Sequence, residues 1–309
     1  LTLAMLEAYY DVNHAEQFDE LFGQLYIGQH PTKLHNQFLI MRFNFSEVSS
    51  NVNEVELSFK LHCCSKLKDF VFKYEDLLGK EIWDVLDEKI QEEPGAFLSA
   101  INSYATRKKN IRIYLLIDEY DNFTNQLLTA YNDPLYEEVT TNDSFLRTFF
   151  KVIKKGIGEG SIRTCFCTGV LPVTMDDLTS GYNIAEILTL EPNFLNMLGF
   201  TYEETETYLR YVLDKYSTGQ DRFDEIWQLI VSNYDGYRFR PNGDRLFNAT
   251  ILTYFFKKFA ANAGSIPDEL VDENLRTDIH WIRRLTLSLD NAKTMLDALV
   301  IDDELPYNV

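Results

Sequence analysis

Cysteine is scarce in this chain of 309 residues, which contains only four. They form a vicinal pair, Cys63-Cys64, and a Cys165-x-Cys167 pair inside an apolar run, and neither spacing matches a zinc-ligand pattern. Four cysteines in so long a chain also exclude the disulfide framework of small secreted proteins. The composition therefore predicts a reduced, intracellular protein, cytoplasmic or nuclear.

Positive charge is also in short supply. The sequence has 29 Lys and Arg residues against 48 Asp and Glu residues, which gives a formal net charge of −19. Binding to nucleic acid or to an anionic membrane surface depends on Lys and Arg displacing counterions, so this balance excludes a broad surface of either kind. No apolar run reaches the roughly 18 residues that a membrane span requires. We therefore expect no broad nucleic-acid surface and no membrane as a partner, although a local basic patch is compatible with this charge.

Histidine is limited to five residues, and none lies in a motif with Cys165 or Cys167. A hydrolase built on a Cys or Ser nucleophile needs a neighbouring base, so it ranks far behind the functions considered below. Because side chains alternate along a strand, we expect Cys165 and Cys167 to be inert packing residues on opposite faces.

What the sequence does contain is a regular alternation of apolar strands with helical segments. Strands that are apolar throughout are typical of a parallel sheet covered by helices on both faces. The chain is therefore predicted to be an α/β protein. The predicted strands are residues 37–45, 111–118, 161–170 and 187–192.

The pattern changes to helices only from about residue 201. We place a boundary near residue 196, which gives an α/β core over residues 1–195 and a helical region over residues 196–309, with a last helix near residues 291–300.

The segment YLLIDEYDNF, residues 114–123, carries the most chemical information. Its apolar strand ends at Asp118 and Glu119, which is the form of a Walker B element. Ligands bind at the carboxyl edge of an open parallel sheet, where Asp118 could hold Mg²⁺ and Glu119 could orient or deprotonate an attacking water. The alternative is a strand that runs into an acidic surface turn. With Asp121, the segment has three carboxylates within four residues, which is more than a surface turn usually carries.

Thr168 ends the next predicted strand, within RTCFCTGV. P-loop ATPases of the AAA+ type place a polar sensor of the γ-phosphate at this point. A Thr before a Gly is also ordinary turn chemistry. Its order in the chain, one helix after the Walker B candidate, favours the sensor.

A Walker A loop, G-x-x-x-x-G-K-[ST], is missing from the sequence. The Gly79-Lys80 pair precedes Glu81 in a helical, acidic neighbourhood. The glycine-rich residues 156–161 precede a strand and contain no Lys, so they are predicted to connect a helix to a strand.

Several motifs occur together in order: LTLAMLEAYYD, FDELFGQLYIG, IDEYDN, TGVLPVTMDDLTSGYNI and YDGYRF. With these motifs, over about residues 1–285, the chain closely resembles the AAA-ATPase-like family of P-loop ATPases. The resemblance implies an AAA+-like parallel sheet flanked by helices and followed by an all-helical lid. It also implies that the chain starts just after its phosphate-binding loop. We therefore expect unpaired strand edges and a marginally stable fold in the isolated chain.

The resemblance also implies roles for individual residues, with ATP and Mg²⁺ as cofactors. Asp118 would bind Mg²⁺, Glu119 would act on the water, and Thr168 would be the sensor. Arg238, in YDGYRF, would be a lid arginine near the γ-phosphate, although a surface or core-capping role fits it as well. Residues 176–184 would form the loop after the sensor strand. LFNAT, residues 246–250, departs from the family's Tyr-Asn-Pro.

Two functions stay open at this point. The first is an ATP-dependent switch with a moving lid, inactive in this chain if the Walker A loop is absent. The second is a degenerate ATPase fold that serves as a protein-interaction module, in which the 14% aromatic content would supply a partner surface. Either could be oligomeric. The coding sequence upstream of Leu1 discriminates between them.

Overall fold

The computed structural model describes residues 2–51, 53–131, 144–170, 184–216, 222–240 and 243–272. The chain divides into two compact units, Leu1–Ala185 and Glu186–Val309.

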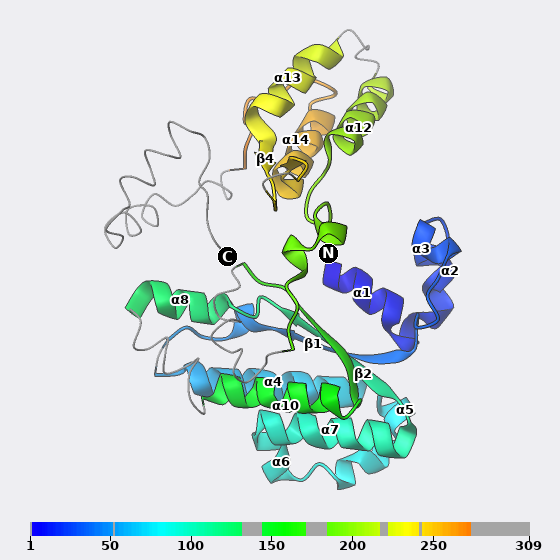
Figure 1. Ribbon diagram of the computed structural model, residues 1–309, viewed down its shortest axis with the longest axis vertical. Helices are drawn as coiled ribbons and strands as arrows, with labels where there is room; N and C mark the ends of the chain where they lie inside the picture. The colour runs from blue at the N-terminus through cyan, green and yellow to red at the C-terminus, as the bar shows by residue number, and fades with distance from the viewer. Residues whose placement is uncertain are drawn as a thin grey trace. The chain divides into compact units, whose positions relative to one another are not determined.

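The first unit combines three strands with helices that precede, connect and follow them (Figure 1). Its strands are β1 (Phe38–Asn44), β2 (Arg112–Asp118) and β3 (Ile162–Cys167). Its α-helices are α1 (Thr2–Tyr10), α2 (Phe18–Phe22), α3 (Tyr26–Gln29), α4 (Val55–Lys73), α5 (Glu75–Leu78), α6 (Glu88–Glu92), α7 (Pro94–Lys109), α8 (Asn122–Tyr131) and α10 (Phe145–Gly158). Short 3₁₀ helices lie at η1 (Val12–Gln17), η2 (Phe45–Glu47) and η3 (Lys80–Asp84).

The three strands form a parallel sheet in the order β1-β2-β3. Three of the predicted strands are therefore confirmed, with ends within a few residues of the prediction. The register places Asn44 opposite Asp118, and Ile117 opposite Cys167. All three strands thus end at one edge of the sheet, which is the edge where polar residues follow the apolar runs.

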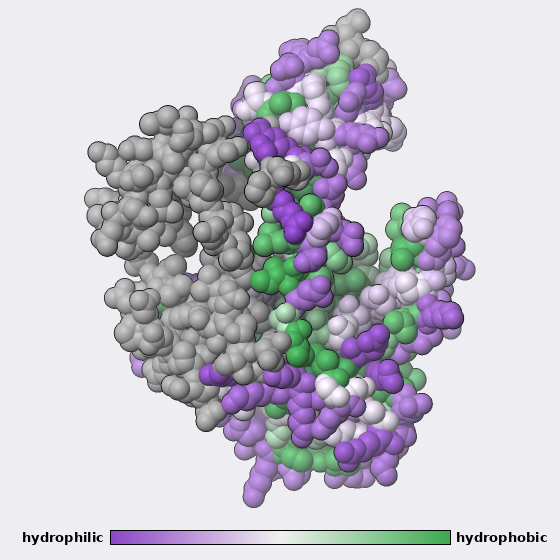
Figure 2. Space-filling model, in the orientation of Figure 1, coloured by the Kyte–Doolittle hydropathy of each residue, from purple (hydrophilic) through white to green (hydrophobic). Residues whose placement is uncertain are grey.

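Alternate side chains of the sheet enter two different cores. Leu39, Met41 and Phe43 pack into the larger core with buried residues of α4, α7 and α10. Phe38 and Ile40 pack on the opposite face against α1. Figure 1 shows α4, α7 and α10 on one side of the sheet and α1 on the other, and the outward side chains of α6 and α7 are mostly hydrophilic in Figure 2.

The outer edge of β1 is capped near its start by one backbone bridge and one side-chain hydroxyl. Asp11 forms an isolated parallel bridge with Phe38, and the Tyr74 hydroxyl accepts a hydrogen bond of 2.9 Å from the Ile40 amide. Such caps satisfy backbone groups that an edge strand would otherwise leave without partners. In the described ranges β3 pairs with β2 only, so it is the other edge strand. The marginal stability of the isolated chain stays a prediction.

An ion pair between a buried carboxylate and a partly exposed ammonium group fastens the end of α1 to α4. Asp11 is fully buried, and its carboxylate lies 2.8 Å from the Lys73 ammonium group. Burial lowers the pKa of Lys73, but hydrogen bonds to Asp11 and Glu7 outweigh burial and hold it above its ordinary value, so Lys73 stays charged.

Lys73→Met is expected to destabilise the protein by about 1–3 kcal/mol, because it leaves the buried Asp11 carboxylate without its cation. Urea unfolding followed by circular dichroism measures this change. Lys60→Met is the matched control, since Lys60 pairs with the exposed Glu56 and Glu93, and a change within about 0.5 kcal/mol is expected there. Equal effects in the two variants would contradict the assigned role of Lys73.

The second unit contains α12 (Tyr202–Lys215), α13 (Phe223–Tyr234) and α14 (Ala249–Ala261) around a core of their apolar side chains. Thr201 and Glu204 form a capping box that starts α12. The prediction of helices only is wrong in detail, because β4 (Asp235–Tyr237) and β5 (Leu246–Phe247) form a short antiparallel sheet. These strands have two or three residues, too few to show a period in the sequence.

The prediction of a strand at residues 187–192 is also wrong. Two 3₁₀ helices occupy this segment, η4 (Leu188–Leu190) and η5 (Pro192–Phe194). Proline fixes its own φ and lacks an amide donor, so Pro192 starts a helical turn more readily than it continues a ladder. The helix predicted near residues 291–300 lies outside the described residues. None of the helices in the described ranges has the length and apolar character needed to cross a membrane.

Candidate functional site

Two side chains from neighbouring strands meet at the carboxyl edge of the sheet. Asp118 is the last residue of β2, and Thr168 directly follows β3. The Thr168 hydroxyl donates a hydrogen bond of 2.7 Å to Oδ1 of Asp118. The predicted carboxylate and the predicted sensor residue, 50 positions apart in the sequence, are therefore in direct contact.

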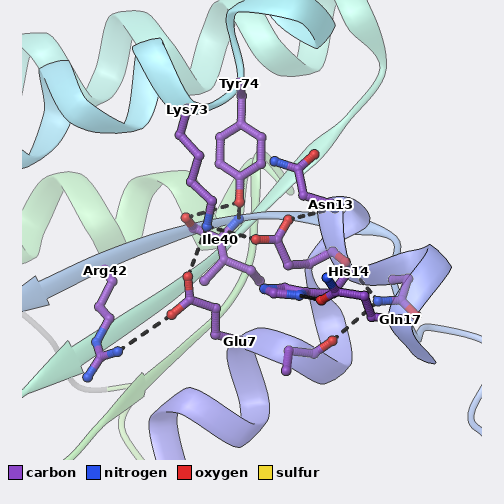
Figure 3. A network of polar contacts seen from close by, with 11 residues as sticks. Glu7, Asn13, His14, Gln17, Ile40, Arg42, Lys73 and Tyr74 are labelled. Carbon is purple, nitrogen blue, oxygen red and sulfur yellow. Dashed lines mark hydrogen bonds and ion pairs between the residues drawn. The ribbon is translucent and has the colours of Figure 1, made fainter. Parts of the chain in front are cut away.

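The second oxygen of Asp118 faces a cation. Nη2 of Arg42, on β1, lies 3.6 Å from Oδ2 of Asp118, and Nη1 of Arg42 lies 3.5 Å from Glu7 on α1. Glu7 in turn accepts a hydrogen bond of 2.9 Å from Lys73, so that Figure 3 shows it between Arg42 and Lys73. These partners were not found from the sequence, because only the register of β1 with β2 brings Arg42 near Asp118.

Glu119 lies in an unusual backbone conformation, with a φ of +50°. Residues other than glycine seldom occupy this left-handed region, and they cluster there at functional sites. Its carboxylate accepts a hydrogen bond of 2.8 Å from the side-chain amide of Asn122, at the start of α8. Glu119 is half-buried and lies next to Asp118 at the same turn.

Asp121, two residues after Glu119, is fully buried. Its carboxylate accepts hydrogen bonds from the Val170 amide, at 3.1 and 3.0 Å to its two oxygens, and from the Asn125 side chain at 2.7 Å. The sequence singled out Asp121 only as part of a dense carboxylate cluster. In the structure it connects the turn after β2 to the turn after β3.

The remaining predicted residues are more dispersed. Arg238 follows β4 in the second unit and is exposed, and its role near a phosphate stays a prediction. The loop predicted at residues 176–184 lies outside the described residues except for Ile184. The glycine-rich residues 156–161 close α10 and lead into β3, with Gly160 at a φ of +73°, as predicted for a helix-to-strand connection.

The prediction that Cys165 and Cys167 lie on opposite faces is wrong. Their sulfur atoms are 3.5 Å apart, because residues two positions apart on a strand share a face, and both pack against the larger core. The hydrogen bond with Cys165, together with burial, holds the pKa of the Cys167 thiol well above its ordinary value. A protonated thiol is a poor nucleophile, which agrees with a packing role.

Two carboxylates and a hydroxyl therefore lie close together at the carboxyl edge of the sheet. Carboxylate oxygens and a hydroxyl are the ligands that Mg²⁺ prefers, and Asp118 presents one oxygen to Thr168 and one toward Arg42. Its side chain is 30% exposed, so it is accessible at the sheet edge. Glu119 is placed next to it with a carboxylate that can orient or deprotonate water. Within the described ranges no three His, Cys, Asp or Glu side chains converge in a group that could hold a metal ion.

The model of the AAA-ATPase-like family, described as a predicted AAA-ATPase, matches residues 1–179. No curated protein and no solved structure matches the chain. The matched segment covers more than half of the sequence and includes Asp118, Glu119 and Thr168. The chain belongs to the AAA-ATPase-like family.

Proposed function

We propose that this protein binds ATP with Mg²⁺ and hydrolyses it at the carboxyl edge of the β1-β2-β3 sheet. The observation that carries the proposal is the hydrogen bond of 2.7 Å from Thr168 to Asp118, which joins the ends of two adjacent parallel strands. Membership of the AAA-ATPase-like family supports a nucleotide as the ligand. Mg²⁺ is usually held by one or two carboxylates together with substrate phosphates, and the single accessible carboxylate of Asp118 suits that mode.

Each residue at the edge has one task in this proposal. Asp118 holds the metal ion, directly or through water, and Mg²⁺ supplies neutralisation of the phosphate charge. Glu119 accepts a proton from the attacking water or orients it. Thr168 fixes the Asp118 carboxylate by hydrogen bonding to Oδ1, while Oδ2 is paired with Arg42 at 3.6 Å. Most of the catalytic effect in phosphoryl transfer comes from such positioning and charge stabilisation.

We further propose that the second unit acts as a lid whose position depends on the bound nucleotide, with Arg238 reaching the γ-phosphate. Its compact helical core supports a body that moves as a whole. The protein would then be a nucleotide-dependent switch.

Thr168→Val is expected to lower Mg²⁺-dependent ATP turnover by about 10- to 100-fold, because the variant loses the hydroxyl that holds Asp118 but keeps the shape of the side chain. Thr168→Ser keeps the hydroxyl and is expected to retain most of the turnover. Phosphate release by the protein as its gene encodes it measures both. Equal turnover in Thr168→Val and the wild type would contradict the role of Thr168, and no turnover in the wild type would leave a non-hydrolysing interaction module as the function.

A further inference from the structure

We infer that Asp121 is a positioning residue that locks the turn after β3 onto the turn after β2, and thereby sets Thr168 against Asp118. The inference rests on the proposed function and adds a residue to the same site. Asp121 acts through the backbone that carries Thr168.

The first support is the burial and bonding of the Asp121 carboxylate. It is fully buried, and a buried carboxylate is stable only where it is paired or receives several hydrogen bonds. Both oxygens accept a hydrogen bond from the Val170 amide, at 3.1 and 3.0 Å. Oδ2 also accepts a hydrogen bond of 2.7 Å from the side-chain amide of Asn125. The side chain of Val170 is exposed and does not anchor the turn. The Asp121 carboxylate therefore holds the turn after β3 through the backbone amide of Val170.

The second support is the close approach of Gly169. A Cβ atom added at Gly169 would lie 2.5 Å from Oδ1 of Asp121 and 2.5 Å from a ring carbon of Tyr120. Only glycine lets the turn after β3 come this near to the carboxylate and the ring. The turn after β2 thus contributes the carboxylate and the ring, and the turn after β3 contributes the glycine that lets them come close.

The third support is that backbone hydrogen bonds carry the contact to Thr168. The Thr168 amide donates to the Ile117 carbonyl at 2.8 Å, and the Tyr120 amide donates to the Thr168 carbonyl at 3.0 Å. The backbone of Thr168 is thus held directly by these two hydrogen bonds. Two residues further along the chain, the Val170 amide is held by the Asp121 carboxylate. The Thr168 hydroxyl donates a hydrogen bond of 2.7 Å to Asp118. A shift of the turn after β3 would therefore lengthen or break this hydrogen bond.

The test replaces Asp121 by Asn, which keeps the size of the side chain but offers one acceptor oxygen where the carboxylate offers two. We expect turnover to fall by about 10- to 100-fold while the KM for ATP changes much less, because positioning of the metal-binding carboxylate is affected and nucleotide contacts are not. Asp69→Asn, on the exposed surface of α4, is the matched control and should leave turnover unchanged.

A double-mutant cycle separates this role from a purely structural one. If Asp121 acts through Thr168, the loss in Asp121→Asn/Thr168→Val should equal the loss in Thr168→Val alone. Losses that multiply, or an Asp121→Asn variant as active as Asp69→Asn, would overturn the inference. A wild type without turnover would instead refute the proposed function, and the inference with it.

Two measurements apply even if Asp121→Asn does not fold. Hydrogen exchange followed by NMR should show slow exchange of the Val170 amide in the wild type, although the Val170 side chain is exposed. Gly169→Ala should lower turnover as Asp121→Asn does, because the new methyl group displaces the carboxylate. Fast exchange at Val170, or full turnover in Gly169→Ala, would overturn the inference.

Discussion

Replacing Asp118 by Asn is expected to abolish Mg²⁺-dependent turnover, with a loss on the order of 10³-fold. The substitution removes the negative charge that the proposal assigns to the metal. A bound metal ion supplies several kcal/mol of charge stabilisation, and each ~1.4 kcal/mol corresponds to tenfold in rate. Asn keeps an oxygen that can accept the Thr168 hydroxyl, so the contact between the two strand ends persists. Asn loses the ion pair with Arg42, whose side chain is 40% exposed, so the effect on folding should be small beside the effect on metal binding.

The measurement is a Mg²⁺ titration of ATP turnover, together with binding of Mn²⁺ followed by electron paramagnetic resonance in the presence of ATP. Asp118→Asn should weaken Mn²⁺ binding, whereas the exposed Asp69→Asn should not. Mn²⁺ binding that is identical in Asp118→Asn and the wild type would show that the metal ion binds elsewhere.

Replacing Glu119 by Gln is expected to give a protein that binds ATP but does not release phosphate. Gln cannot accept a proton from water, and the loss of a general base typically lowers a rate by ~10²- to 10⁴-fold. The amide oxygen of Gln can still accept the hydrogen bond from Asn122, so the turn at Glu119 should keep its left-handed conformation. ATP affinity should consequently be retained, and the bound nucleotide should stay trapped as ATP.

Binding of a fluorescent ATP analogue and the chemical state of the bound nucleotide after incubation test this prediction. Glu20→Gln, exposed on α2, is the control for the loss of one carboxylate. Bound ADP in Glu119→Gln, at the level found in the wild type, would contradict the assignment of Glu119 to the water.

The three strands of the sheet were predictable because each is an uninterrupted apolar run that ends in polar residues. Leu115, Leu116 and Ile117 are all fully buried, as expected for a central parallel strand with both faces covered. The run at residues 187–192 also begins with apolar residues, but it is shorter and contains a glutamate and a proline, and it forms 3₁₀ turns instead. Composition alone did not distinguish a buried strand from an apolar connection.

Asp118, Glu119 and Thr168 were singled out from the sequence because their positions follow from where strands end, and their roles stay predictions. Other parts of the site depend on geometry that the sequence does not encode locally. Arg42 reaches Asp118 only through the register of β1 with β2, and the contact of Asp121 with Val170 joins turns 49 positions apart. The alternation of Cys165 and Cys167 was interpreted incorrectly, since the period of a strand is two residues.

The central claim is that the carboxyl edge of this sheet hydrolyses ATP with Mg²⁺. Phosphate release from ATP by the protein as its gene encodes it, measured with and without Mg²⁺ in the wild type and in Glu119→Gln, tests it most directly. The account predicts Mg²⁺-dependent release in the wild type and a loss of at least ~10²-fold in Glu119→Gln. No Mg²⁺-dependent release in the wild type, or equal release in the two proteins, would contradict it.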